Sequence, residues 1–342
     1  MARMRIKDVA EAAHVSPSTV SRYLNGHYEA MSDETRERIA GVIERTGYQP
    51  SNVARSLRTD RSYTLGVVIA DLRNPYSAAM LGELDAQAAR RGYSLVTATS
   101  DNDPGREAAA VRRLVATGVD GLVVNTCDED PDALLEACGS TPAVLLDRDT
   151  SPSVLPLVTS NNAQLISALV DELRAARCAR LLLVTEADAT SSVRRARADA
   201  FVSALAERGL DGGVVAIDRA EGAGSLGELG RELAEGRQLG VIAVNGLVFL
   251  RVVEMVGELG LDVPRDVRLA TFDDYAWNHV LYGGVTTAVQ NTRRIAGEVL
   301  DLVLDPGHTD VPPVRVEVPG SLIERASTRT SSRRGTGTRG NA

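Results

Sequence analysis

Hydrophobic residues near the start of the chain recur at helical spacing. Ile6, Val9 and Ala10 stand at positions i, i+3 and i+4, which gives a first helix one apolar face. Ser16 offers a capping oxygen for a second helix, and Pro17 takes its first position, where a missing N–H costs nothing. A third amphipathic run, with Ser32 as its capping residue, follows before a polar, arginine-containing segment. The pattern predicts a small head of three helices.

Beyond residue 64 the pattern changes to short apolar runs that alternate with amphipathic helices. Runs such as Leu65–Ala70 and Gly240–Asn245 are rich in β-branched residues, and helical stretches such as Tyr76–Arg91 separate them. This alternation is typical of parallel sheets with helices on both faces. About ten such runs are too many for one sheet of usual size, so we expect an α/β fold with two doubly wound lobes.

The same pattern divides the chain into four parts. The helix after Asn291 and the run Val314–Val318 are expected to return to the first lobe, and the last residues have no apolar period. The expected parts are a helical head (1–50), a polar linker with one helical turn (51–61), a two-lobed body (62–325; lobe 1 about 62–160 plus 292–325, lobe 2 about 161–291) and a disordered tail (326–342).

Charge is distributed unevenly along the chain. Residues 1–61 carry ten Lys or Arg against eight Asp or Glu, and residues 328–342 carry four Arg and no acid. The net charge of −8 therefore leaves −14 on residues 62–327. An acidic body repels polyanions, but a slightly basic head can bind DNA locally. No apolar run approaches the ~20 residues of a membrane span, and the start of the chain lacks a secretory signal. Three scattered cysteines favour a reducing cytoplasm, and we expect no metal and no cofactor.

The first two helices are typical of a helix-turn-helix, whose second helix enters the major groove of DNA. A three-helix cap without a ligand would have the same pattern. The candidate contacts on the second helix are small polar or basic residues, with Ser18, Thr19 and Arg22 toward base edges and Ser16, Ser21 and Asn25 toward phosphates.

Three segments carry a family resemblance: IKDVAEAAHVSPSTVSRYLNG (6–26), YQPSNVARSLRT (48–59) and TLGVVIADLRNPYSAAMLGELDAQAARRGY (64–93). They resemble the lactose-repressor (LacI) family of bacterial transcription regulators, and the likeness extends to SLIERAST (321–328). It implies a helix-turn-helix, a hinge helix and a two-lobed effector domain similar to periplasmic sugar-binding proteins. It also implies a homodimer on palindromic double-stranded operator DNA, and no enzymatic activity.

The resemblance assigns roles within the head and hinge. Pro17, Ser18 and Arg22 fall where the family reads bases, and Leu57 falls where a hinge leucine wedges between minor-groove base pairs. Arg55 and Arg58 would then lie beside phosphates. A lone apolar Leu57 in a polar segment otherwise packs on a lobe, and the resemblance favours insertion. His14 replaces the usual turn glycine, and histidine tolerates a left-handed backbone at modest cost.

Candidate ligand residues follow the strands, where doubly wound folds bind small molecules. Carboxylates, amides and guanidinium groups near aromatic rings suit a polyol, although each polar residue alone also fits ordinary helix capping. By resemblance Asn74, Arg197 and Asp273 line the effector cleft, and Gly246 stands where the family usually has aspartate. The effector candidates are Asn74, Tyr76, Asp147, Arg148, Arg197, Asn245, Asp273, Trp277 and Gln290.

The arginines favour an acidic sugar, because a bidentate guanidinium of Arg148 or Arg197 matches a carboxylate better than a hydroxyl. The stretches AVNGLVFLRVVEMVGELGL (243–261) and FDDYAWNHVLYGGVTTAVQ (272–290) resemble the branch that regulates 2-keto-3-deoxygluconate use. We therefore expect a sugar or sugar-acid effector, with 2-keto-3-deoxygluconate the leading candidate.

Two other classes of protein share parts of this pattern. A solute receptor for transport has two such lobes but no use for residues 1–61, and a sugar-acid enzyme needs an acid–base pair, metal cluster or phosphate loop. Gly222–Gly227 fits the dinucleotide pattern G-x-G-x-x-G, but Asn245 stands where the acidic residue is expected. The sequence therefore favours a ligand-responsive repressor.

Replacing Leu57 with Ala tests the hinge assignment. Loss of the wedge is expected to reduce both DNA bending and specific operator affinity, while salt-sensitive nonspecific binding persists. Gel-shift titrations on operator and scrambled duplexes measure the two affinities. Unchanged operator affinity in Leu57→Ala would show that this leucine packs on protein.

Overall fold

A computed structural model describes most of the chain. The described residues are 4–24, 26–29, 31–48, 61–187, 191–217, 227–235, 238–305 and 313–329. The predictions for Asn25, Arg55, Leu57, Arg58 and the glycine pattern at 222–227 lie outside these ranges. The chain divides into a unit that ends at Thr64 and also contains Gly118–Asp120, and a larger unit made of the rest.

The head contains three helices: α1 (Ile6–Ala12), α2 (Pro17–Leu24) and α3 (Asp33–Thr46). Their apolar faces meet in a small core that includes Val9, Val20 and Ile39, all fully buried. The predicted caps are present, because Ser16 Oγ accepts the Thr19 N–H at 3.2 Å and Ser32 Oγ accepts the Thr35 N–H at 3.3 Å. The turn residue His14 has the left-handed φ of 52° that the pattern requires.

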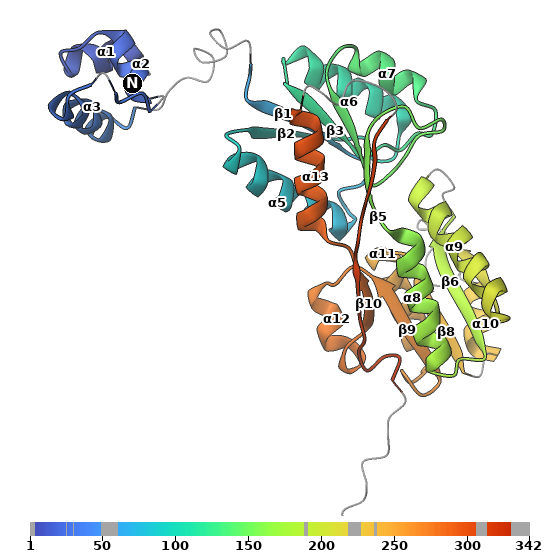
Figure 1. Cartoon of the computed structure of the whole chain (residues 1–342). Helices are drawn as coiled ribbons and strands as arrows, with labels where there is room; N and C mark the ends of the chain where they lie inside the picture. The colour runs from blue at the N-terminus through green and yellow to red at the C-terminus, as the bar shows by residue number, and fades with distance from the viewer. Residues whose placement is uncertain are drawn as a thin grey trace, which may run out of the picture. The chain divides into compact units, whose positions relative to one another are not determined.

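The larger unit holds two sheets of mainly parallel strands with helices packed on them, as Figure 1 shows. The first sheet has the strand order β11-β5-β4-β3-β1-β2. Its helices α5 and α13 pack on each other, as do α6 and α7. The elements of this lobe are β1 (Thr64–Ile69), α5 (Pro75–Arg90), β2 (Ser94–Thr99), α6 (Pro104–Ala116), β3 (Gly121–Val124), α7 (Asp132–Cys138), β4 (Ala143–Leu146), β5 (Leu157–Ser160), α13 (Thr292–Leu304) and β11 (Arg315–Val318).

The second sheet has the order β12-β10-β9-β8-β6-β7, and its buried strands form one continuous apolar core with the helices. Helices α8 and α9 pack on each other in this lobe. The elements are α8 (Asn162–Ala175), β6 (Arg180–Glu186), α9 (Ser192–Arg208), β7 (Asp211–Ile217), α10 (Gly227–Glu235), β8 (Leu239–Ala243), α11 (Gly246–Glu258), β9 (Val267–Phe272), α12 (Ala276–Val280), η2 (Leu281–Gly283), β10 (Thr286–Val289) and β12 (Ser321–Ile323). Both sheets confirm the predicted α/β architecture.

Two boundaries differ from the sequence prediction. Residues 292–325 were assigned to the first lobe, but β12 pairs antiparallel with β10 in the second sheet. A strand of three residues is too short for a hydrophobic period to reveal it. The predicted disordered tail also starts too early, because Ser327 and Thr328 are fully buried. Their hydroxyls hydrogen-bond to the second lobe, which polar composition alone does not predict.

Three segments cross between the lobes, after β5, β10 and β11, and hydrogen bonds hold them together. The Ser160 hydroxyl donates to Gln290 Oε1 at 2.7 Å, which joins the first crossover to the second. Asn161 Oδ1 accepts the Gly320 N–H at 2.9 Å, which joins the first to the third. No helix in the described ranges is long and apolar enough to cross a membrane.

Gly320→Ala tests the packing of these crossovers. A Cβ at Gly320 would lie 2.5 Å from the Val289 carbonyl oxygen, which no side-chain rotation relieves. We expect a loss of about 1–3 kcal/mol in unfolding free energy, measured by urea denaturation. Gly213→Ala is the matched control, since a Cβ there meets nothing within 4 Å. Equal stabilities of the two variants would contradict the close approach.

Candidate functional site

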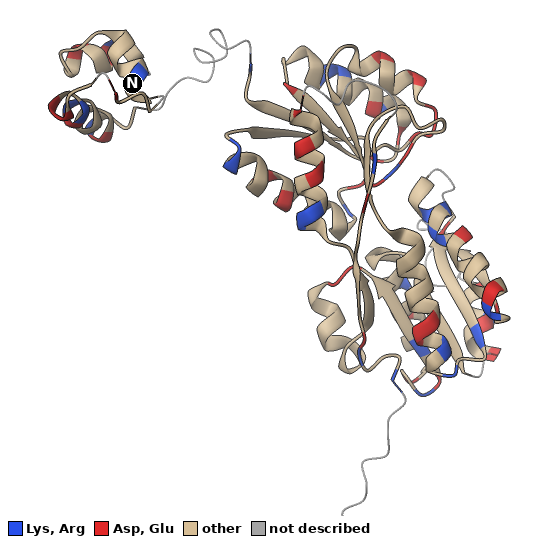
Figure 2. Cartoon of the chain, viewed as in Figure 1, with Lys and Arg blue, Asp and Glu red and all other residues tan. Residues whose placement is uncertain are grey.

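The exposed face of α2 presents the predicted DNA contacts. Pro17, Ser18 and Arg22 are exposed, whereas Val20 is fully buried in the head core and fixes the orientation of the helix. The sequence of α2 holds no acidic residue, unlike α3, where Asp and Glu alternate with Arg (Figure 2). A face with hydroxyls and one arginine is compatible with the major groove and with phosphates.

The Ser16 hydroxyl organises the start of α2. It hydrogen-bonds to the Ser18 hydroxyl at 2.6 Å and to the Thr19 hydroxyl at 2.9 Å. Ser21 is half-buried on the same helix. The structure therefore brings the predicted residues of 16–22 onto one short helix.

A second group of polar residues lies between the lobes. We use the name interlobe cluster for Tyr76 and Asp147 of the first lobe with Arg197 and Asp273 of the second. Tyr76 comes from the first turn of α5 and Arg197 from α9, whereas the two aspartates follow β4 and β9. Their side chains interact electrostatically with one another across the lobes. These are the strand ends at which doubly wound folds bind ligands.

Arg197 is a buried cation whose contacts are supplied by the second lobe. Its side chain is 4 % exposed, and its guanidinium lies 3.8 Å from the centre of the Phe272 ring. Nε donates to Asn162 Oδ1 at 2.7 Å, and NH1 donates to the Val244 carbonyl at 2.5 Å. Burial lowers the pKa of Arg197, while Asp147 and Asp273 act in the opposite direction.

The two aspartates share an unusual backbone conformation and a similar environment. Each has a φ of 67°, in the left-handed region, where the chain turns away from its strand. Burial raises the pKa of both carboxyl groups, and the charge of Arg197 partly offsets that rise. Asp273 Oδ1 also accepts a hydrogen bond from Gln290 Nε2 at 2.8 Å. The cluster therefore holds two carboxylates that are expensive to ionise without further partners.

Several buried polar atoms at this place have no hydrogen-bond partner among the described residues. They include Tyr76 Oη, Asp147 Oδ1 and Trp277 Nε1. The Trp277 ring packs beside Tyr275 with ring centres 4.7 Å apart. More than 90 % of buried polar groups in native proteins are paired. Unpaired donors and acceptors gathered at one place indicate a site that a polar molecule completes.

Other predicted ligand residues have structural contacts. Asn74 Oδ1 accepts the Tyr76 N–H at 3.1 Å, and Asn245 Oδ1 accepts the Val248 N–H at 2.9 Å, so both cap helices. The Arg148 guanidinium donates to Asn102 Oδ1 at 3.1 Å within the first lobe. Both asparagines therefore cap helices through their side-chain oxygens. The side-chain nitrogen of Asn245, Nδ2, also donates a hydrogen bond to Glu186.

Sequence reasoning missed two residues at the cluster. Asn162 binds Arg197, and Tyr275 lies beside Asp273. Asn162 does follow a strand, so position was an available signal.

Tyr275 also explains the glycine at position 246. A Cβ on Gly246 would lie 2.6 Å from the Tyr275 ring and 3.5 Å from Trp277. The aromatic pair therefore occupies the space that a side chain at the start of α11 would take. At Gly246, where the sequence departs from the family pattern, the missing side chain leaves room for these two aromatic rings.

Comparison with known protein families covers nearly the whole chain. Residues 5–51 match the family model described as bacterial regulatory proteins, lacI family. Residues 62–223 match the periplasmic binding proteins and sugar binding domain of the LacI family, and 170–328 match a periplasmic binding protein-like domain.

Relatives match over almost their full lengths. The chain is 35 % identical over 329 residues to the HTH-type transcriptional regulator PtxS of Pseudomonas plecoglossicida, covering 95 % of this chain and 96 % of that one. It is 31 % identical to the HTH-type transcriptional regulator KdgR of Bacillus subtilis, with 94 % and 97 % covered. The fold is similar to that of the lac repressor dimer bound to operator and the anti-inducer ONPF, with a TM-score of 0.80, 22 % identity, and 96 % and 100 % covered.

Tyr76→Phe tests whether the interlobe cluster awaits a ligand. Removing a buried hydroxyl that has no partner is expected to leave the ligand-free protein as stable or more stable, by up to about 1–3 kcal/mol. The stabilisation gained from a bound polar ligand is expected to fall. Thermal unfolding without and with ligand measures the stability of the free protein and the stabilisation by ligand. Tyr282→Phe, which removes a hydroxyl outside the interlobe cluster, is the control. A destabilised ligand-free Tyr76→Phe would show that the hydroxyl has a protein partner.

Proposed function

This chain belongs to the lacI family of bacterial regulatory proteins, and from that membership we propose that a polyhydroxylated sugar acid in the interlobe cluster controls its binding to operator DNA. The chain is a DNA-binding transcription regulator, since its full-length relatives are HTH-type transcriptional regulators. The observation that carries the effector site is the group of unpaired atoms, Tyr76 Oη, Asp147 Oδ1 and Trp277 Nε1.

The cluster is hydrogen-bonded directly to the segments that cross between the lobes. Arg197 Nε donates to Asn162, which follows the first crossover strand β5, and Asp273 accepts from Gln290, which follows β10. Gln290 in turn accepts from Ser160. An effector that reorients Arg197 or Asp273 therefore acts on the crossovers themselves. A ligand with different affinities for two lobe arrangements shifts their populations.

Further contacts join the lobes beside the cluster. The Asp149 N–H donates to Ser192 Oγ at 2.8 Å, and Glu129 forms an ion pair with Arg195 of α9. These partners come from first-lobe loops and the start of a second-lobe helix. A change in lobe spacing has to break or rebuild them, which gives the two arrangements different contacts, as a population shift requires.

A sugar acid fits the mixture of groups better than an apolar ligand does. Tyr76 Oη and Trp277 Nε1 supply hydrogen-bond donors, and Asp147 Oδ1 supplies an acceptor for a hydroxyl. Arg197 is the cation at the centre of the cluster, and Arg148 is bonded within the first lobe. The acid group is supported by Arg197 and by the branch resemblance, and 2-keto-3-deoxygluconate is the leading candidate.

We also propose that the protein is a homodimeric repressor in the cytoplasm, where operator DNA lies, and that it acts by binding alone. The similarity of the fold to the lac repressor dimer supports a dimer, and the exposed side of α5 carries small residues at Ala78, Ala79, Gly82 and Ala86 beside the exposed Asp85. The neighbouring edge strand β2 exposes Val96.

Selection of genomic fragments followed by footprinting tests the DNA-binding proposal. The full chain is expected to protect two half-sites related by twofold symmetry, because a dimer presents two heads. Truncation to residues 62–342 removes the head and hinge and is expected to abolish protection. A footprint without twofold symmetry would contradict the dimeric complex.

A thermal-shift panel tests the effector class on the same preparation. It compares 2-keto-3-deoxygluconate and gluconate with the neutral matched sugar glucose. A ligand at ~100 times its dissociation constant stabilises the native state by about 2.7 kcal/mol. Sugar acids are expected to shift the melting temperature more than glucose does. A shift by glucose alone would overturn the acid assignment and leave the DNA-binding function intact.

A further inference from the structure

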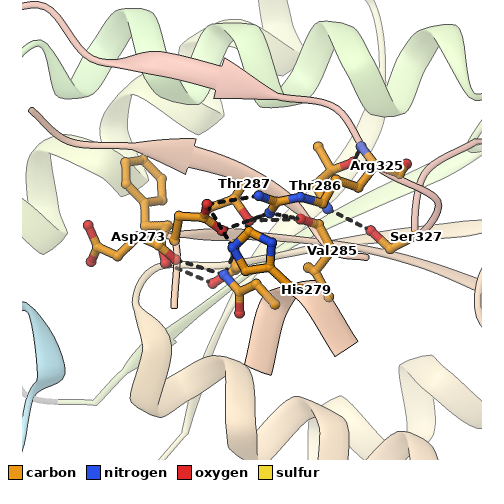
Figure 3. Close-up of polar contacts among 11 residues, drawn as sticks. Asp273, His279, Val285, Thr286, Thr287, Arg325 and Ser327 are labelled. Carbon is orange, nitrogen blue, oxygen red and sulfur yellow. Dashed lines mark hydrogen bonds and ion pairs between the residues drawn. The ribbon is translucent and has the colours of Figure 1, made fainter. Parts of the chain in front are cut away.

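The turn after β9 contains adjacent aspartates whose carboxylates have different partners, and Figure 3 shows Asp273 with the nearby His279 and Arg325. Asp273 belongs to the interlobe cluster, where it accepts from Gln290. Asp274 instead binds Arg325 in a two-point fork, with NH1 2.7 Å from Oδ1 and NH2 2.8 Å from Oδ2. His279 Nε2 lies 3.3 Å from the same carboxylate. One turn therefore connects the proposed effector site to a residue near the end of the described chain.

Arg325 is held in place by its own contacts. NH1 also donates to the Val285 carbonyl at 2.9 Å, and the Arg325 backbone N–H donates to Thr286 Oγ1 at 2.9 Å. Its stem packs on Gly284, where a Cβ would lie 2.9 Å from the Arg325 Cδ. The side chain of Arg325 is 14 % exposed. An arginine that is held both at its backbone and at its guanidinium group is a rigid support for the carboxylate that it binds.

The residues after Arg325 anchor this support to the body of the second lobe. Ser327 Oγ donates to the Leu269 carbonyl on β9 at 2.6 Å and accepts the Thr286 N–H on β10 at 2.9 Å. Thr328 Oγ1 donates to Glu172 on α8 at 2.5 Å. The segment 325–328 is thus bonded to two strands and one helix.

The Asp273 turn needs such support. The left-handed φ of 67° at Asp273 costs energy for a residue other than glycine and persists only where neighbours enforce it. Asn278 Nδ2 donates to the Asp273 carbonyl at 2.8 Å and to Thr287 Oγ1 at 3.2 Å. Arg325 NH1 reaches the same Thr287 hydroxyl at 3.4 Å. Arg325 is therefore linked to Asp274 directly and to the Asp273 carbonyl through Thr287 and Asn278.

We propose that Arg325 is a positioning residue for the effector site, which it serves by holding Asp274 and thereby the orientation of Asp273. This inference rests on the proposed function of the interlobe cluster. The pair carries charge at neutral pH: although burial acts to raise the pKa of Asp274, hydrogen bonds and charge from Arg325, with His279, lower it overall. A charged, bidentate pair fixes direction better than a neutral contact does.

The test compares Arg325→Gln with Arg208→Gln. Arg208 forms a fork with Asp171 in the same lobe, at 2.8 and 2.9 Å, and is 15 % exposed, but it contacts no residue of the interlobe cluster. Both variants lose one bidentate pair formed by an arginine of similar burial, although Asp171 is more exposed than Asp274. Melting temperatures without ligand show whether each variant folds, and operator affinity without effector reports the head and hinge. Asp274→Asn, which keeps the shape of the side chain, is the second variant.

Hydrogen exchange of the ligand-free proteins measures the positioning directly. The Asp273 N–H, which donates to the Ala288 carbonyl at 2.8 Å, is expected to exchange faster in Arg325→Gln and Asp274→Asn and at the wild-type rate in Arg208→Gln. The concentration of 2-keto-3-deoxygluconate that half-saturates the operator response is expected to rise about tenfold in the first two variants and less than about twofold in the control. Arg325→Lys restores charge without the fork, so its rise is expected to be intermediate.

Wild-type exchange at Asp273 in Arg325→Gln would overturn the inference, and so would equal effector shifts in Arg325→Gln and Arg208→Gln. The exchange measurement uses no effector. A wild type that responds to no sugar acid would therefore count against the proposed effector class, while the exchange result still decides the role of Arg325.

Discussion

The second lobe of this molecule depends on one constraint, a guanidinium group that is buried between two carboxylates. Removing a charge from water costs several kcal/mol unless hydrogen bonds and opposite charges replace the solvent. Arg197 obtains them from Asn162 and the Val244 carbonyl, with Asp147 and Asp273 nearby. Two of these interactions reach the segments that cross between the lobes. The electrostatic cost of the site is therefore linked to how the lobes are arranged, and a ligand that supplies the missing hydrogen bonds changes that cost.

Much of the fold was predictable because it depends on local rules. The periodicity of Ile6, Val9 and Ala10 predicted the first helix, and the Ser16 and Ser32 caps predicted where the next two begin. Alternating apolar runs predicted the parallel strands, since a strand buried on both faces reads as continuous hydrophobic sequence. Strand β12 was missed because three residues have no period, and its place is set by pairing with β10.

The candidate site was predictable in outline and not in detail. Strand ends identify Asp147 and Asp273, because topology brings the carboxyl ends of parallel strands to one edge. Asn74 and Asn245 lie at the same edge but cap helices. The choice between capping and ligand contact depends on side-chain direction, which no spacing rule determines. Trp277 was among the sequence candidates, but its pairing with Tyr275 was not predictable, because the fit of the two rings depends on the absent side chain of Gly246.

Coupling between the effector site and DNA binding is the central claim, and thermodynamic reciprocity tests it most directly. An effector that changes operator affinity by a given factor must have its own affinity changed by the same factor when operator is bound. Calorimetric titration of 2-keto-3-deoxygluconate into the full chain, alone and saturated with its selected operator duplex, measures both affinities. The account predicts a difference of about 5-fold or more. Equal affinities in the two titrations would contradict it.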